Sequence, residues 1–410
     1  MGKKNSNAWL VVLGSTISLI FSNGPVLFFT FAVFLKPVSE QLGWSRGTMS
    51  LAVTFGLILG GLATPFAGIA VDRWGIRKVT LIFITLFAAS FAAISLATAH
   101  VSVFIILYAI AGLFAGGQAP LPYAKAICGW FEARRGLALG IAMAGVGIGL
   151  AIIPQVVRVL LNSFDWRTTY VIVGAITWLI AFPAVFFFVK DPPTDLERAA
   201  AGSPVTTVAD GDDISFALRH KDFWLTVIAA FLVVTAINGV IAHLVALLTD
   251  HGVPNDIAVR ILVAVGLSAI VGRLLSGFLL DRFFAPYLAA ASFLVPLAGI
   301  AILLTGVTAT PLIIVAAVCL GLGLGAEVDI IGFLVGRYFG LRRYGEIYGY
   351  IFAVFTMGTG IGPYLMGVSF DATASYKVAL AGFCGLLLLS SVLIAMLGPY
   401  RYPARELAHA

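Results

Sequence analysis

Twelve apolar segments fill most of this chain, and each is about long enough to cross a lipid bilayer. Apolar residues make up 60% of the sequence and charged residues only 11%, with a mean hydropathy of +1.05. A membrane-spanning helix needs about 20 apolar residues, whereas the helices of a water-soluble enzyme carry polar faces. The sequence therefore predicts an all-α membrane protein. The expected spans are roughly 8–35, 47–71, 79–98, 103–128, 136–160, 167–189, 223–249, 257–280, 287–305, 310–336, 345–369 and 375–398.

Lysine and arginine are distributed unequally over the connections between these segments. With both termini on one side, that side carries 17 of the 25 cationic residues and the opposite side carries six. Cytoplasmic connections hold the excess in membrane proteins, so we expect a multi-pass protein of the cell membrane (plasma or bacterial inner membrane) with both termini in the cytoplasm. The net charge of +6 is then a topology signal. No basic patch interleaved with aromatic residues predicts a nucleic-acid partner.

No sequence pattern indicates bond-making chemistry. Cys128, Cys319 and Cys384 are far apart in apolar stretches, which is typical of buried side chains and not of a disulfide or metal site. The phosphate-binding loop, the His-Glu-x-x-His metal motif and the nucleophile elbow are all absent from the sequence. We therefore expect a transporter that is not an enzyme and uses no cofactor, catalytic residue or metal.

Sequence patterns recur at a spacing of about 209 residues, which is half the chain length. A Gly-x-x-x-Asp-Arg pattern at 68–73 returns at 277–282, and the sequence Trp-Phe-x-x-Arg-Arg at 130–135 returns as Tyr-Phe-x-x-Arg-Arg at 338–343. Such a period indicates an internal duplication. It predicts two pseudo-symmetric six-helix bundles.

The polar stretch 190–222 contains three prolines, an acidic cluster and no apolar run. We expect it to be a cytoplasmic connection between the bundles 1–189 and 223–410. Transporters place their substrate site between two such repeats, so the predicted site lies in a cavity where the halves meet.

The loop after the second span reads Gly-x-x-x-Asp-Arg-x-Gly-x-Arg-Lys at 68–78, and it resembles the loop signature of the major facilitator superfamily. The glycine allows close helix packing, and the cations favour the anionic cytoplasmic leaflet. The resemblance implies a major facilitator fold with these loops as gating elements. The residues assigned to gating are Gly68, Asp72, Arg73, Gly75, Arg77, Lys78, Asp281, Arg282, Arg134 and Arg135.

A narrower resemblance rests on the Trp-Phe-x-x-Arg-Arg-Gly sequence at 130–136 and on Arg273 in the eighth span. Together these are similar to the monocarboxylate transporters and to their bacterial relatives, the oxalate:formate exchangers. In those families an arginine at this place binds the carboxylate of the substrate. The resemblance therefore implies a carrier of small organic acids.

Arg273 is the first candidate for substrate binding. A guanidinium near the middle of the membrane is energetically costly and is expected to face a cavity or a partner. It can bind a carboxylate through a charge-assisted, bidentate pair. The alternative is a permanent ion pair with an acidic residue of a neighbouring helix.

The chain also departs from these families. Oxalate exchangers carry a second cation in the eleventh span, and Phe355 occupies the aligned position. A dicarboxylate would then keep one charge uncompensated at low dielectric, so we expect one carboxylate. Animal monocarboxylate transporters place an aspartate four residues before the arginine, where this chain has Ala269. Their proton relay is therefore not expected here.

Glu327, Asp329 and His243 are the candidates for proton coupling. Two residues that are two apart on a helix point about 200° apart, so Glu327 and Asp329 cannot both face the cavity. The repeat aligns Glu327 with Gln118, which favours Glu327 as the cavity-facing acid and Asp329 as a structural partner of a neighbouring helix or loop cation. Both acids could also be structural. His243 titrates nearest neutral pH, or it is a hydrogen-bonded packing residue.

Further polar residues within spans could hydrogen-bond a substrate or join helices. The candidates are Asn23, Asn238, Gln118 and Tyr123.

These residues predict proton-coupled uptake of short monocarboxylates, similar to lactate or pyruvate, by alternating access. The alternatives are an oxalate:formate type exchanger, an exporter of larger amphipathic compounds and a transporter-like receptor. The expected partners are the small carboxylate, protons and the lipid bilayer, with the monomer as the functional unit.

Overall fold

The computed structural model describes residues 2–98, 100–131, 135–191, 211–280, 282–340 and 343–402. These residues form helices and no β-strand. Twelve helical spans among them are long and apolar enough to cross a membrane. The predicted all-α class with twelve spans is confirmed.

Six of these spans lie in the first half of the chain. The first is built from α1, the π-helix η1 and α2, and the fourth from α5, the 3-10 helix η3 and α6. The helices are α1 (Gly2–Ile20), η1 (Gly24–Phe29), α2 (Phe31–Leu42), α3 (Arg46–Trp74), α4 (Ile76–Ala93), the short η2 (Ile94–Leu96), α5 (Val101–Ala115), η3 (Gly116–Gln118), α6 (Pro120–Trp130), α7 (Arg135–Ser163) and α8 (Trp166–Phe188).

The second half contributes the other six spans, each a single helix, after the short helix α10. The helices are α10 (Ile214–Arg219), α11 (Lys221–Asp250), α12 (Asn255–Leu280), α13 (Ala285–Leu304), α14 (Thr310–Phe339), α15 (Tyr344–Thr373) and α16 (Lys377–Ala395).

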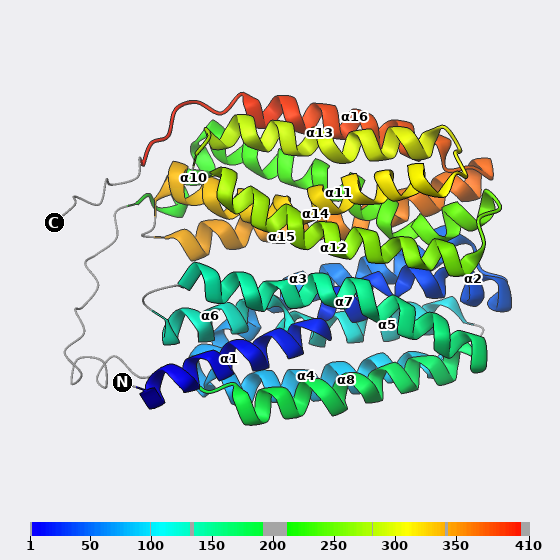
Figure 1. The fold of residues 1–410 in the computed structure, drawn as a ribbon, viewed down its shortest axis with the longest axis horizontal. Coiled ribbons are helices and arrows are strands. Elements are labelled where there is room, and N and C mark those ends of the chain that lie inside the picture. Colours follow the sequence, from blue (N-terminus) through cyan, green and yellow to red (C-terminus); the bar gives the residue numbers. More distant parts are fainter. Residues whose placement is uncertain are drawn as a thin grey trace.

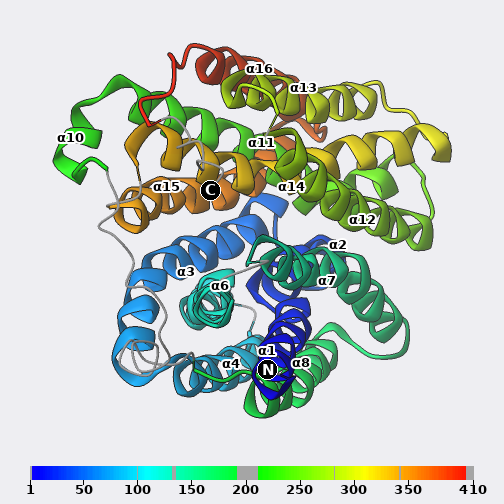
Figure 2. The ribbon, with the colours of Figure 1, turned by 60° about the vertical axis from the view of Figure 1, so that its left-hand side comes forward.

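The helices of the two halves lie in two groups. Figure 1 shows α11 to α16 above α1 to α8, and Figure 2 shows the same division from nearer one end of the bundle. In Figure 1, α1 begins and α16 ends at the same end of the bundle; we call the opposite end the far end. Residues 192–210 of the expected connection lie outside the described residues, and the domain boundaries stay a prediction.

The first and fourth spans are broken near their middle. In the first, α1 ends at Ile20 and η1 begins at Gly24, where Pro25 lacks a backbone N–H. In the fourth, α5 gives way to η3, and Pro120 opens α6. Interrupted helices leave backbone groups available for a ligand, and transporters build substrate sites around them. The sequence analysis did not predict these breaks.

Small residues join the two groups of helices. α7 packs on α12 where a Cβ at Gly147 would lie 2.4 Å from Ile270, and α3 packs on α15 where a Cβ at Gly61 would lie 2.9 Å from Thr356. Near the far end, a Cβ at Gly367 would lie 2.7 Å from the Cα of Gly47. Such contacts allow close backbone approach without a hydrophobic driving force in lipid.

Candidate functional site

Arg273 and Asp329 form an ion pair between α12 and α14. Nε of Arg273 lies 3.5 Å from Oδ2 of Asp329, and the two side chains are 22% and 34% exposed. Glycines bring the two helices together: a Cβ at Gly325 would lie 2.0 Å from the carbonyl oxygen of Ala269, and one at Gly272 would lie 2.4 Å from a carbonyl oxygen of α14. Because Asp329 follows Gly325 by one turn, it lies on the same face and meets Arg273.

Arg273 keeps unused hydrogen-bonding capacity in this arrangement. A guanidinium carries five N–H donors. Its one contact with a described charged residue is the ion pair with Asp329 at 3.5 Å, and no described residue accepts a hydrogen bond from the guanidinium. The side chain is also partly exposed. It can therefore bind a carboxylate in addition to Asp329 or in its place.

Glu327 lies on another face of α14, which packs within the second group of helices, although it is still near enough to interact electrostatically with Arg273. Glu327 lies one turn after Gly323, on the same face of α14. A Cβ at Gly323 would lie 2.8 Å from Pro296 of α13 and 3.2 Å from Ile237 of α11. Glu327 is 1% exposed, and no described residue forms a hydrogen bond with its Oε2. Glu327, which was expected to face the cavity, is therefore buried, whereas Asp329 pairs with a cation of the neighbouring α12, as the sequence analysis expected of it.

Four aromatic side chains of α15 stack beside the ion pair. Tyr344, Tyr348, Phe352 and Phe355 have successive ring centroids 5.7, 5.6 and 5.4 Å apart, at interplanar angles of 9°, 20° and 14°. Arg273 and Asp329 both lie near enough to interact electrostatically with the Tyr348 hydroxyl. We call these four residues the aromatic ladder. The sequence analysis named only Phe355, although the spacing of four, four and three residues places all four on one helix face.

His243 on α11 is 0% exposed and contacts α3 and α15. Its Nε2 lies 3.0 Å from the carbonyl oxygen of Pro363 and 2.9 Å from Oγ of Ser50, and its Nδ1 lies 3.1 Å from the Tyr376 hydroxyl. The Pro363 carbonyl can only accept, so Nε2 carries a proton and donates to it. Burial raises the pKa of Tyr376, which lies in the connection after α15. The Tyr376 hydroxyl therefore stays protonated and can donate to Nδ1 when His243 is neutral.

Three of the other four polar candidates use their side chains locally, whereas the buried amide of Gln118 has no hydrogen-bond partner among the described residues. Oδ1 of Asn23 accepts from the backbone N–H of Gly24 at 2.8 Å, at the break in the first span. Asn238 donates to the Val234 carbonyl at 3.1 Å. Gln118 is buried at the break in the fourth span, and the hydroxyl of Tyr123 lies 2.6 Å from Oγ of Ser18 on α1. None of the four forms a hydrogen bond with Arg273 within the described part of the chain.

The loop signature lies where α3 ends and α4 begins. Gly75 ends α3 with φ +87, a conformation that favours glycine. Oδ1 of Asp191, just after α8, accepts from the backbone N–H of Ile76, and Arg77 donates to the carbonyl of Phe186 at 2.5 Å. The loop is therefore tied to the end of α8.

The second loop and its neighbours are described only in part. The guanidinium of Arg282 stacks 3.7 Å from the Phe278 ring. Arg134 and Asp281 lie outside the described residues, as do the side chains of Asp72 and Arg135. Their gating roles stay predictions.

A charged network joins the two groups of helices at the far end. Lys36 on α2 lies 2.8 Å from Oδ1 of Asp250 on α11, and Arg46 at the start of α3 pairs with the same carboxylate. Arg46 also donates to the Tyr376 hydroxyl at 2.5 Å. The carboxylate of Asp371 on α15 accepts from the backbone N–H of Arg46 at 3.0 Å. We call these five residues the far-end network. Lys36 and Arg46 are two of the six cations that the sequence analysis counted on the side opposite the termini.

The sequence matches the family model described as Major Facilitator Superfamily over residues 17–331. The MFS-type transporter YhjX of Escherichia coli is 26% identical over 363 residues, covering 86% of this chain and 85% of the relative. Monocarboxylate transporter 13 of Rattus norvegicus is 26% identical over 394 residues, covering 95% and 88%.

Solved structures show the same fold. The nucleoside transporter NupG superposes with a TM-score of 0.75 at 14% identity, covering 96% of this chain and all of that one (100%). An inward-facing bacterial homolog of the human lysosomal transporter Spinster gives a TM-score of 0.64 at 17% identity, covering 96% and 94%. Since the family model spans well over half of the chain, this multi-pass membrane protein belongs to the major facilitator superfamily of transporters, with monocarboxylate transporters among its relatives.

Proposed function

We propose that the protein takes up small monocarboxylates together with protons by alternating access between its two groups of helices. In this proposal both termini lie in the cytoplasm and the far end faces the outside of the cell. The observation that carries the proposal is Arg273, a partly exposed cation in the eighth span whose guanidinium forms no hydrogen bond with a described residue. The relationship to monocarboxylate transporters supports the same substrate class.

The substrate carboxylate binds Arg273 in this mechanism. Because the guanidinium is planar and permanently charged, it pairs with a carboxylate through two parallel N–H donors. Asp329 already occupies one side of it, so substrate and Asp329 compete for the same cation. Protonation of Asp329 removes its charge and releases Arg273 for the incoming acid, which couples proton binding to substrate binding.

One carboxylate fits the site better than two. The described titratable groups that interact electrostatically with Arg273 are Asp329, Glu327 and Tyr348, none of which is cationic. A second substrate carboxylate would stay unpaired at low dielectric, at a cost of several kcal/mol. This argues against oxalate-like dicarboxylates.

A second candidate function is transport of larger organic anions, including export. The aromatic ladder favours it, because four stacked rings beside Arg273 present a large apolar surface to the non-carboxylate part of a ligand. Uptake of pyruvate and of benzoate by the same vesicles compares the two candidates directly.

The test is uptake of labelled pyruvate into proteoliposomes. Arg273→Ala and Arg273→Lys should both abolish uptake, since lysine keeps the charge but loses the planar pair of donors. Arg260→Ala is the matched control, because Arg260 is an exposed cation near the far end, paired only with Asp256 one turn away on α12. Transport at the wild-type rate by both Arg273 variants would overturn the proposal.

The coupling ion is tested in the same vesicles. Lowering the external pH should raise the initial rate, and a protonophore should stop accumulation while leaving counterflow of labelled substrate intact. Strict dependence on an internal counter-anion without any pH response would indicate an exchanger. Absence of both uptake and counterflow for every acid tested would indicate a receptor.

A further inference from the structure

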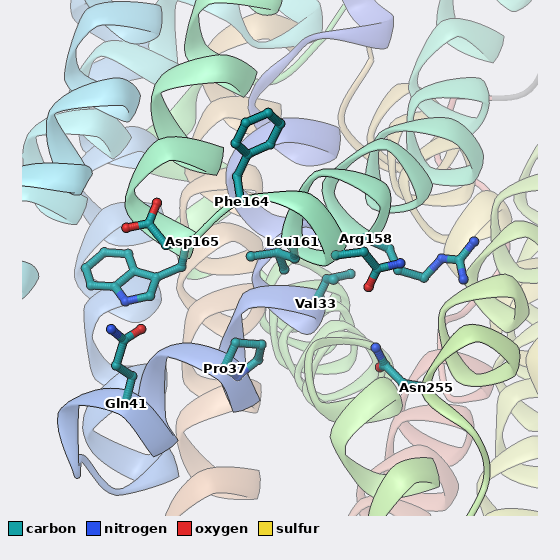
Figure 3. Close-up of a pocket in the computed structure, with 10 residues that line it drawn as sticks. Val33, Pro37, Gln41, Arg158, Leu161, Phe164, Asp165 and Asn255 are labelled. Carbon is teal, nitrogen blue, oxygen red and sulfur yellow. The ribbon is translucent and has the colours of Figure 1, made fainter.

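A pocket of about 280 Å³ lies at the far end, apart from Arg273. Figure 3 shows that Gln41 and Pro37 come from α2, Arg158 from α7, and Asn255 from the start of α12. The pocket thus lies between the first group of helices and the beginning of α12. Neither the candidate substrate site nor the far-end network includes any of these side chains.

Two buried N–H groups of this pocket have no acceptor in the described chain. One is Nε of Arg158 on α7, and the other is Nε1 of Trp166 at the start of α8. Trp166 is only 2% exposed. A buried donor without an acceptor costs about 1–3 kcal/mol, and most buried polar groups in proteins are therefore paired with protein or with a bound molecule. Both unpaired groups are donors, which selects a ligand that accepts hydrogen bonds.

The charge of the pocket selects an anion. No described residue forms an ion pair with Arg158. Asp165 also lines the pocket, but its carboxylate accepts from the backbone N–H of Thr168 at 2.9 Å and points away from Arg158 in Figure 3. The amides of Gln41 and Asn255 offer further donors at the rim.

The floor of the pocket is apolar. Val33 is 4% exposed, and Leu161 and Pro37 lie beside it. An inorganic oxyanion would leave this surface uncovered, whereas a short organic acid can place its carboxylate at Arg158 and its carbon atoms against Val33 and Leu161.

We propose that this pocket is a second binding site, which holds a small monocarboxylate through Arg158 at the far end of the protein. The inference rests on the proposed function for the class of acid. With the far end outside the cell, the pocket binds the acid on the side from which uptake begins.

The test measures equilibrium binding of labelled propionate to the purified protein. In an Arg273→Ala background, which removes the central site, about one molar equivalent should still bind. Arg158→Gln in that background should weaken binding by about tenfold or more, since it removes a charge-assisted hydrogen bond. Arg260→Gln removes a charge at the same end outside the pocket and should leave binding unchanged.

A second variant does not depend on a change at a partly buried residue. Gln41 is exposed, so Gln41→Glu should fold normally and should weaken propionate binding by placing a carboxylate at the rim. Thr308→Glu adds the same charge to an exposed position of the connection before α14 and should have no effect. Labelled sulfate serves as the inorganic probe and should bind more weakly than propionate.

The proposal is overturned if the Arg273→Ala protein binds no propionate, if Arg158→Gln and Gln41→Glu both bind as well as their controls, or if sulfate binds and propionate does not. Failure of the proposed function has a different signature. In that case Arg273→Ala transports pyruvate normally, while propionate binding still depends on Arg158.

Discussion

Nε of Arg273 on α12 and Oδ2 of Asp329 on α14 lie 3.5 Å apart, in a pair whose side chains are both partly exposed. Glu327 lies only two residues earlier on α14 but is 1% exposed on the opposite face of the helix. The two acids therefore have different relationships to the cation. Asp329 competes with any carboxylate that binds Arg273, and Glu327 does not.

The first prediction separates these two acids. Asp329→Asn should abolish the pH dependence of uptake and the accumulation of substrate, because asparagine resembles the protonated acid permanently. Exchange of internal for external substrate should persist, since a carrier that no longer binds its proton can still swap one bound anion for another. Initial rates at several external pH values, together with counterflow, measure both effects.

Glu327→Gln is the matched control for this prediction. It changes a carboxyl to an amide two residues away, and it should keep the pH dependence and the thermal stability of the protein, because no described residue pairs with Oε2. If Glu327→Gln loses the pH response and Asp329→Asn keeps it, Glu327 carries the proton, as the repeat alignment with Gln118 indicated.

The second prediction concerns the far-end network. Asp250 is shared by Lys36 and Arg46, so Asp250→Asn removes the charge that holds α2 and α3 to α11. We expect the far end to open more often, with the closed-to-open ratio falling roughly 5- to 30-fold for a loss of about 1–2 kcal/mol, since the partly exposed pair contributes less than a fully buried one. Spin labels at positions 40 and 308, in a cysteine-free background, should report a longer distance.

Asp256→Asn is the control for the far-end network. Asp256 pairs only with Arg260 at 3.8 Å on its own helix, so its loss should leave the distance distribution unchanged. Identical distributions for Asp250→Asn and the wild type would show that the network does not close the far end.

The third prediction concerns the contact that brings α14 onto α12. A Cβ at Gly325 would lie 2.0 Å from the carbonyl oxygen of Ala269 and 2.9 Å from the backbone nitrogen of Arg273. Gly325→Ala should force the helices apart, lower stability by about 1–3 kcal/mol and weaken the pH dependence that the Arg273 pair confers. Thermal unfolding and uptake at two pH values measure these effects.

A second alanine substitution tests whether the effect is local. Nothing lies within 4 Å of a Cβ at Gly140 on α7, so Gly140→Ala should be neutral or stabilise the helix by about 0.5–1 kcal/mol. Equal stability of the two variants would contradict the close-packing argument.

The apolar pattern was sufficient to predict the helices but not their interruptions. Spans follow from about 20 apolar residues and from the loss of hydration in lipid, and all twelve were found. The breaks at Gly24 and at Gly116 to Gln118 lie inside runs that are apolar on average, so mean hydropathy carries no signal for them. Pro25 and Pro120 are the residues that could have indicated both.

The candidate site was predictable by residue type and less so by orientation. The cost of a mid-membrane cation singled out Arg273. The directions in which Glu327 and Asp329 point were inferred from the alignment of the repeats. In the structure these directions depend on Gly325 and Gly272, which set the distance between α12 and α14. Such contacts depend on which helices are neighbours, and a single sequence does not specify that. The aromatic ladder was missed because the sequence analysis considered Phe355 alone and not the ring positions that precede it on the same helix face.

The last prediction concerns His243, which the sequence analysis left open between proton coupling and packing. Its ring joins three elements: Nε2 donates to the Pro363 carbonyl of α15 and lies 2.9 Å from Oγ of Ser50 on α3, while Nδ1 accepts from the Tyr376 hydroxyl. Tyr376 in turn accepts from Arg46. Protonation of Nδ1 would break the bond from Tyr376 and add a charge near Arg46. We therefore expect His243→Gln to lower thermal stability by several degrees while the pH dependence of uptake remains. Loss of the pH dependence at unchanged stability would instead assign the coupled proton to His243.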